Sequence, residues 1–190
     1  MELQEARKVI EECGLVVFPT ETAYGIAADA TNPDAVEKVY EAKQRPQEKG
    51  LTAIVSSLEQ AERYAKLSDN ERKIVKELMP GPITLVSEKK DRIPDSMNEK
   101  FVFRVSSSKT ARTLAENIPI TATSANISGE ETSYSIEDIS DKLLEKVDFV
   151  IDTGKLEDGP TSTITEIVDG EVVIHREGPI KKKEIEKVVE

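Results

Sequence analysis

The sequence predicts an α/β (α+β) fold in which helices pack around a twisted β-sheet of mixed strand direction. Helical and strand patterns alternate along most of the chain, and strands cluster near its end. Polar turns precede or follow the strands, and such turns gather at one edge or concave face of a sheet, where sites are usually built. A length of 190 residues, with 37% hydrophobic and 33% charged residues, suits a soluble globular protein. We therefore expect a single domain over residues 1–190, without a second C-terminal domain.

The first part of the chain is expected to form a strand–turn–helix–loop–strand unit behind an N-terminal helix. The predicted elements are a helix at 3–13, a strand at 15–18, a polar loop at 20–25, a helix from Pro33 to about Lys43 and a strand at 51–55. Asn32 is a suitable N-cap, and Pro33 suits the first helical position. The helix must end before Pro46, because the residue preceding a proline avoids helical geometry.

The remaining elements are expected from capping patterns, apolar runs and turn signals. Ser57-x-x-Gln60 and Ser68-x-x-Glu71 each open a helix. Next come strands at 82–87 and 101–105, a helix at 109–117, a strand at 119–123, a hydroxyl- and glycine-rich turn at 124–130, a helix at 135–144 and a strand at 148–153. Strands at 163–168 and 171–176 flank Asp169-Gly170, a strong hairpin signal. Residues 181–190 form a short charged helix.

Composition excludes several classes of site. Cys13 is the only cysteine and His175 the only histidine, so an intrachain disulfide and a zinc site of several histidines or thiolates are ruled out. His175 lies in a strand, where a structural role is commoner than a catalytic one. No apolar run approaches the roughly 20 residues that span a bilayer, and no signal peptide is evident, so we expect a cytoplasmic protein. The net charge of −11 opposes non-specific binding to nucleic acid but allows a local basic groove.

Cations beside the polar turns favour an anion-binding pocket, most simply for the phosphates of a nucleotide. No G-x-x-x-x-G-K-[ST] or G-x-G-x-x-G pattern is present, so discrete side chains and turn amides would hold the phosphates. The cations concerned are Lys43, Arg45, Lys49, Arg104 and Arg176. For any single one of them, a solvated surface position remains the alternative. Arg104 interrupts an apolar strand, and a buried arginine needs an anionic partner, either a carboxylate or a ligand.

Seven short motifs occur in one order along the chain. They are PTET-x-YG, K-x-RP-x-x-K, PGP-x-T, FRV, TSAN-x-SG, ST-I and REG. Each motif is weak alone, but the ordered set is specific. Over roughly residues 3–180 the chain resembles the YrdC-like threonylcarbamoyl-AMP synthase family, in its short, single-domain form. The resemblance implies a mixed sheet with helices around a deep concave basic cavity.

The resemblance also implies a reaction, in which L-threonine, bicarbonate or carbon dioxide, and ATP yield threonylcarbamoyl-AMP and pyrophosphate. Magnesium would be bound by the phosphates, and no protein side chain is assigned as a metal ligand. A separate transferase complex would pass the threonylcarbamoyl group to tRNAs that read codons beginning with A, without tight binding of tRNA by this chain. By similarity, the ATP-binding residues are Lys43, Arg45, Lys49, Ser124, Asn126, Thr132 and Arg176, of which Lys43, Arg45, Ser124 and Asn126 would also position the reacting groups. The residues expected to bind L-threonine are Thr22, Arg104 and Ser162, and none is assigned as a general acid or base.

Three departures from the family pattern affect the expected threonine contacts. Gly50 stands where many members have proline, Ser106-Ser107-Ser108 replaces a proline and a polar ring residue, and Ile54 lies near the place of a common histidine. Gly50 predicts a more flexible loop. Two alternative functions remain open. One is a carbamoyl-adenylate-forming domain of the hydrogenase-maturation type, and the other is a non-enzymatic module that binds structured RNA, such as tRNA or rRNA, in a concave basic groove.

Overall fold

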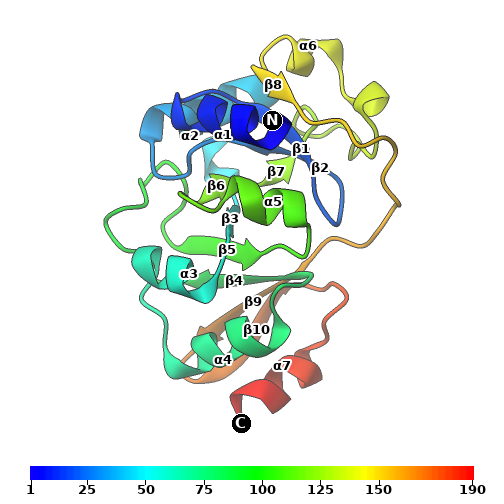
Figure 1. Cartoon of the computed structure of the whole chain (residues 1–190). Helices are drawn as coiled ribbons and strands as arrows, with labels where there is room; N and C mark the ends of the chain where they lie inside the picture. The colour runs from blue at the N-terminus through cyan, green and yellow to red at the C-terminus, as the bar shows by residue number, and fades with distance from the viewer.

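The computed structural model describes all 190 residues and contains two mixed β-sheets with helices around them (Figure 1). Sheet A has four strands in the order β7-β2-β1-β8, and sheet B has six in the order β10-β9-β4-β5-β3-β6. The predicted α/β fold with mixed strand direction is confirmed, and its strands are divided between two sheets. No helix is both long and apolar enough to cross a membrane.

Sheet A is built from four short strands. They are β1 (Val16–Pro19), β2 (Tyr24–Ala27), β7 (Thr123–Ser124) and β8 (Phe149–Val150). Strand β1 pairs antiparallel with β2 and parallel with β8, and β2 pairs antiparallel with β7. Every residue of β1 and β2 is buried, which explains their almost continuous apolar sequence.

Sheet B contains the longest strands of the molecule and has six strands in all. They are β3 (Ala53–Val55), β4 (Ile83–Ser87), β5 (Phe101–Val105), β6 (Ile120–Thr121), β9 (Thr163–Val168) and β10 (Glu171–Arg176). Strands β9 and β10 form the hairpin predicted at Asp169-Gly170, where φ is +53° and +86°. Positive φ at both central residues is the geometry that this dipeptide favours, so the hairpin signal is confirmed.

Seven α-helices and two 3₁₀ helices complete the fold. They are α1 (Glu2–Glu11), α2 (Pro33–Lys43), η1 (Gln47–Lys49), α3 (Leu58–Tyr64), α4 (Asp69–Leu78), α5 (Lys109–Leu114), η2 (Ile136–Asp138), α6 (Asp141–Leu144) and α7 (Lys182–Val189). The N-terminal helix α1 lies at the sheet A end of the molecule, and α4 and α7 lie together at the far end of sheet B (Figure 1).

Local capping signals mark the helix starts correctly. The Asn32 side chain accepts the Asp34 N–H at 2.9 Å at the start of α2. Ser68 and Glu71 form a complete capping box at the start of α4. Helix α2 ends at Lys43, and Gln44 adopts a left-handed conformation with φ +50° before Pro46. These contacts lie within a few residues of each cap, which is why the sequence reveals them.

The polar loop predicted at 20–25 is shorter than expected. Tyr24 and Gly25 begin strand β2, and both are buried. A Cβ at Gly25 would lie 3.2 Å from the ring of Phe18 and 3.3 Å from the Thr123 carbonyl oxygen. Glycine therefore allows the strands to pack closely here. Because the segment begins with polar residues, its sequence predicted a loop instead of the start of a strand.

The strand predicted at 119–123 is two strands in different sheets. Strand β6 belongs to sheet B and β7 to sheet A, with Ala122 between them. The Ala122 N–H donates to Thr52 O at 2.7 Å, and the Thr121 hydroxyl accepts the Ala28 N–H at 2.9 Å. The segment therefore ties the two sheets together.

Two predicted helices are also corrected. The helix expected at 135–144 is divided into η2 and α6, because the Asp138 carboxylate accepts the Ser135 N–H at 2.9 Å and Ser140 starts a new turn. The helix expected at 109–117 ends at Leu114. Beyond it, the Asn117 amide donates to Glu11 at 2.9 Å, a contact with the end of α1 that competes with helix continuation.

Two apolar clusters hold the elements in place. The larger has 33 buried residues and spans both sheets, with Tyr24 and Ile26 from β2 beside Phe101 and Phe103 from β5. The smaller cluster packs α1 and α5 against β1. Because the two sheets share one apolar core, their packing fixes the position of one sheet relative to the other.

Candidate active site

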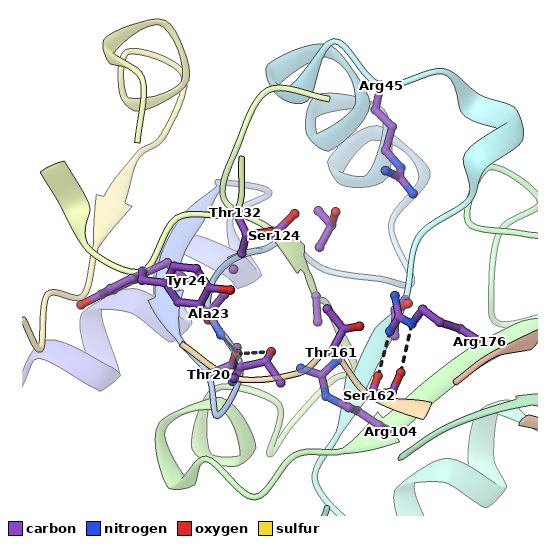
Figure 2. Close-up of a pocket in the computed structure, with 17 residues that line it drawn as sticks. Thr20, Ala23, Tyr24, Arg45, Arg104, Ser124, Thr132, Thr161, Ser162 and Arg176 are labelled. Carbon is purple, nitrogen blue, oxygen red and sulfur yellow. Dashed lines mark hydrogen bonds between the residues drawn. The ribbon is translucent and has the colours of Figure 1, made fainter. Parts of the chain in front are cut away.

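A cavity of about 320 Å³ lies between the two sheets (Figure 2). Tyr24 and Ser124 line it from sheet A, and Arg104 and Arg176 line it from sheet B. The long connection between β8 and β9, residues 151–162, has no helix or strand and contributes its last residues to the lining. The cavity thus depends on segments from the whole length of the chain.

The lining of this cavity is polar and contains no carboxylate. It carries three arginines and many hydroxyl groups. Most of the predicted site residues lie in it, namely Thr22, Arg45, Arg104, Ser124, Thr132, Ser162 and Arg176. Lys43, Lys49 and Asn126 lie outside the lining. Cations surrounded by neutral hydroxyls favour an anionic ligand.

The turn that connects β1 to β2 is organised by Thr20. Its hydroxyl donates to Ala23 O at 2.7 Å and accepts the N–H groups of Thr22 and Ala23, both at 3.2 Å. The Thr22 hydroxyl lies 3.1 Å from the Thr20 hydroxyl. Both threonines line the cavity, but the Thr20 hydroxyl is committed to the turn, whereas Thr22 is half-buried.

Arg45 reaches the cavity from the loop that follows α2. Its Nε donates to Gly50 O and its Nη2 to Lys49 O, both at 3.0 Å. The Nη1 atom makes no hydrogen bond within the protein, so this arginine keeps donors for a ligand. Burial lowers the pKa of Arg45 from its usual value. Lys49 is exposed on η1 and is not one of the residues that line the cavity.

Gly50 is tightly packed, in contrast to the flexible loop expected there. Its φ is +56° and its ψ is 175°, a conformation that is open almost only to glycine. A Cβ at this position would lie 1.6 Å from Asn98 Oδ1. The Asn98 amide donates to Leu51 O, and Leu51 N donates to Met97 O at 3.1 Å. The loop is thus fixed in the shape that lets Gly50 O hold Arg45.

Lys43 is 1% exposed and does not face the cavity. Its Nζ donates to Ser124 O, to Asn126 O at 2.6 Å and to Asn126 Oδ1 at 3.4 Å. Burial, and next the positive charge of Arg45, lower the pKa of Lys43 to about 7. An ammonium has three donors, and all three already have acceptors. A direct phosphate contact would therefore require Lys43 to give one up.

Lys43 stabilises the loop that follows β7. The Lys43 carbonyl also accepts the Ser128 N–H at 2.8 Å. Within the loop, the Ser124 hydroxyl donates to Asn126 Oδ1, and Asn126 Nδ2 donates to Glu130 O at 2.8 Å. Asn126 is buried among these contacts, whereas Ser124 presents its hydroxyl to the cavity.

Arg176 and Ser162 form the sheet B corner of the cavity. Arg176 donates from Nε to Ser162 O at 3.0 Å and from Nη2 to Ser162 Oγ at 3.1 Å (Figure 2). The Ser162 hydroxyl also lies 2.8 Å from the Thr84 hydroxyl. Burial, and next the charge of Arg104, lower the pKa of Arg176. A Cβ at Gly178 would lie 2.4 Å from Thr163 N, so the glycine of the REG motif lets the chain pass closely beside this corner.

Arg104 is buried, and its Nε donates to Glu21 Oε1 at 3.1 Å. The Glu21 carboxylate thus supplies an anionic partner for this buried guanidinium. Sequence reasoning missed Glu21, although it lies within the PTET motif. Its only signal in the sequence was Arg104 itself, because a charged residue within an apolar strand needs an anionic partner if it is buried.

Tyr24 belongs to the PTET-x-YG motif but has no role in the predicted site. Its ring lines the cavity, and its hydroxyl donates to Gly154 O at 2.8 Å and accepts the Thr153 N–H at 3.0 Å. It therefore anchors the start of the connection 151–162. His175, in contrast, lies outside the lining and pairs with Glu166 at 2.8 Å, in keeping with a structural role.

The chain is thus an α/β domain in which a polar cavity lined by arginines lies between two mixed sheets. The chain belongs to the Sua5/YciO/YrdC family, whose sequence model, described as telomere recombination, matches residues 8–178.

Several proteins and solved structures are similar to this chain over most of its length. A Methanocaldococcus jannaschii protein is 39% identical over 183 residues, which cover 95% of this chain and 88% of that protein. The threonylcarbamoyl-AMP synthase of Bacillus subtilis is 32% identical over 198 residues, covering 99% of this chain and 56% of the relative. The crystal structure of Pyrococcus abyssi Sua5 complexed with L-threonine is 34% identical with a TM-score of 0.91, covering 98% of this chain and 56% of that one. The chain thus spans little more than half the length of the latter two proteins.

Proposed function

We propose that this protein makes threonylcarbamoyl-AMP and pyrophosphate from L-threonine, bicarbonate or carbon dioxide, and ATP. The observation that supports this most directly is the cavity lining, in which three arginines and many hydroxyls occur without a carboxylate. Such a lining suits two anionic substrates, an amino-acid carboxylate and a polyphosphate. The family and its named relatives agree with this assignment.

The proposed ATP-binding residues are Lys43, Arg45, Lys49, Ser124, Asn126, Thr132 and Arg176. Arg45 contributes donors held in place by the Gly50 carbonyl. Ser124 contributes a hydroxyl whose position depends on the loop that Lys43 supports. In this arrangement Lys43 and Asn126 act mainly through the shape of the loop, and Lys49 reaches the phosphates from the exposed side of η1.

The proposed threonine-binding residues are Thr22, Arg104 and Ser162. Arg104 would bind the carboxylate, because its terminal nitrogens have no hydrogen-bond partner within the protein. Thr22 and Ser162 offer hydroxyls that can bond to the threonine hydroxyl or carboxylate. All three line the same cavity as Arg45 and Ser124, so both substrates can be bound together.

The proposed chemistry needs positioning more than a protein nucleophile. The threonine amine adds to carbon dioxide and loses a proton, which gives an N-carboxylate. One oxygen of this group attacks the α-phosphorus of ATP, and the bond from that phosphorus to the bridging oxygen breaks as pyrophosphate leaves. Fixed arginines lower the repulsion between the attacking carboxylate and the phosphates.

Magnesium would enter this site together with ATP. The cavity lining offers no carboxylate, and no cluster of three or more His, Cys, Asp or Glu side chains suits a metal ion. A hard cation held by phosphate oxygens and water fits such a lining. We further propose that the product passes to a separate transferase complex that modifies tRNA, and that this chain itself binds tRNA only weakly.

Pyrophosphate release tests the proposal. With ATP, magnesium and fresh bicarbonate, we expect release that depends on added L-threonine. Arg45→Ala should remain folded and raise the KM for ATP by about tenfold or more, the loss of a charge-assisted hydrogen bond. Arg63→Ala, on the exposed face of α3, is the matched control and should behave as the wild type. Release that is independent of threonine, or salt-sensitive tight binding of tRNA without turnover, would contradict the proposal.

A further inference from the structure

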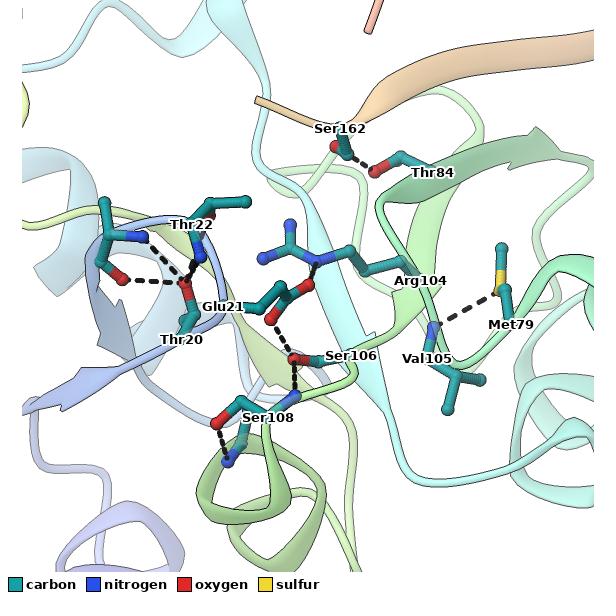
Figure 3. A network of polar contacts seen from close by, with 12 residues as sticks. Thr20, Glu21, Thr22, Met79, Thr84, Arg104, Val105, Ser106, Ser108 and Ser162 are labelled. Atoms are coloured by element: carbon teal, nitrogen blue, oxygen red, sulfur yellow. Dashed lines mark hydrogen bonds and ion pairs between the residues drawn. The ribbon is translucent and has the colours of Figure 1, made fainter. Parts of the chain in front are cut away.

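The turn between β1 and β2 holds Glu21 against a residue on the opposite sheet. Glu21 is only partly exposed, and its carboxylate lies between Arg104 of β5 and Ser106 (Figure 3). Oε1 accepts from Arg104 Nε at 3.1 Å, and Oε2 accepts from the Ser106 hydroxyl. Each oxygen of the carboxylate thus has its own donor.

The pairing leaves the outer part of the Arg104 guanidinium free. The bond to Glu21 uses Nε, which lies nearest the strand, and neither Nη1 nor Nη2 has a partner within the protein. Arg104 lines the cavity, so these terminal nitrogens are the donors available there. Rotation of the planar guanidinium about the Cδ–Nε bond would break the contact between Nε and Glu21, so this contact fixes its orientation.

Ser106, which donates a hydrogen bond to Glu21, is itself fixed by further contacts. Ser106 is fully buried, and its hydroxyl accepts the Ser108 N–H at 3.1 Å. The Ser106 carbonyl accepts from Arg112 on α5. Ser106 and Ser108, which lie where the family pattern has a proline and a polar ring residue, therefore support the carboxylate from behind.

We propose that Glu21 is a positioning residue that fixes the Arg104 guanidinium so that its terminal nitrogens meet the carboxylate of the amino-acid substrate. The inference rests on the proposed function and adds a residue that does not line the cavity. Glu21 also balances the charge of Arg104 close to a second cation, Arg176, whose pKa Arg104 lowers. Without Glu21, the two arginines would repel each other, and Arg104 would be free to turn toward the phosphates.

The test compares the KM for L-threonine and the KM for ATP in Glu21→Gln and Ser106→Ala, with pyrophosphate release as the assay. Glutamine keeps an oxygen for Arg104 Nε but loses the charge. We expect Glu21→Gln to raise the KM for threonine by about tenfold and to leave the KM for ATP within about twofold, since one charge-assisted bond is weakened. Ser106→Ala should produce a smaller rise in the same constant.

Glu62→Gln is the matched control, because Glu62 pairs with Arg72 Nε at 2.7 Å outside the cavity. It should leave both constants unchanged. An unchanged KM for threonine in Glu21→Gln, a loss of kcat alone, or equal rises in both KM values would overturn the positioning role. Absence of turnover in the wild type would instead refute the proposed function, and the inference with it.

Discussion

Replacing Lys43 with methionine should change how the free energy of unfolding depends on pH. Lys43 is 1% exposed, and burial, followed by the charge of Arg45, lowers its pKa from 10.5 to about 7. Methionine has a similar unbranched length and carries no titratable group. A comparison of the two proteins across pH therefore isolates the protonation of this one side chain.

The direction of this pH dependence follows from the number of protons that Lys43 binds in the folded and the unfolded states. In the unfolded chain Lys43 is protonated up to its ordinary pKa of 10.5, whereas in the folded protein it loses its proton above about pH 7. Between these limits unfolding takes up a proton, so the stability of the wild type rises with pH. One proton corresponds to about 1.4 kcal/mol per pH unit. Between about pH 7 and about pH 9, the wild type should gain about 2 kcal/mol relative to Lys43→Met.

Urea unfolding at several pH values in this window measures the difference. Most other titrations are common to both proteins and cancel. Lys49→Met removes an exposed lysine from the nearby η1 and serves as the matched control. A difference between wild type and Lys43→Met that stays constant would refute the reasoning, because it would show that the bonds to Ser124 and Asn126 keep Lys43 protonated in the folded protein.

Two further variants test the packing around the cavity. Gly50→Ala should lower the free energy of unfolding by about 2 kcal/mol or more, since alanine is strained at φ +56° and meets Asn98; urea unfolding measures this. Gly129→Ala, with positive φ but open space around it, is the control, and an equal loss there would contradict the role of the Asn98 contact. Tyr24→Phe should cost about 1 kcal/mol and speed proteolysis within 151–162, because the connection loses its anchor. Tyr64→Phe should show neither effect, and unchanged proteolysis of Tyr24→Phe would contradict the anchoring role.

Features that depend on neighbouring residues could be predicted from the amino-acid sequence alone. Asn32 and Ser68 cap helices because their side chains bond to N–H groups within three residues. Asp169-Gly170 forms a hairpin because both residues accept positive φ. The ordered motifs identified the family, since they are read directly along the chain. Short strands that cross between sheets, as at 119–123, give no such local signal.

Which donors face the cavity depends on the three-dimensional packing and could not be predicted from the sequence. Lys43 and Arg45 are two residues apart and look equivalent in sequence, yet one supports a loop and the other lines the cavity. Glu21 and Arg104 are separated by 83 positions and meet only because β1, β2 and β5 come together around a shared core. Burial and long-range pairing are set by how the sheets pack, and no pattern of neighbouring residues encodes that packing.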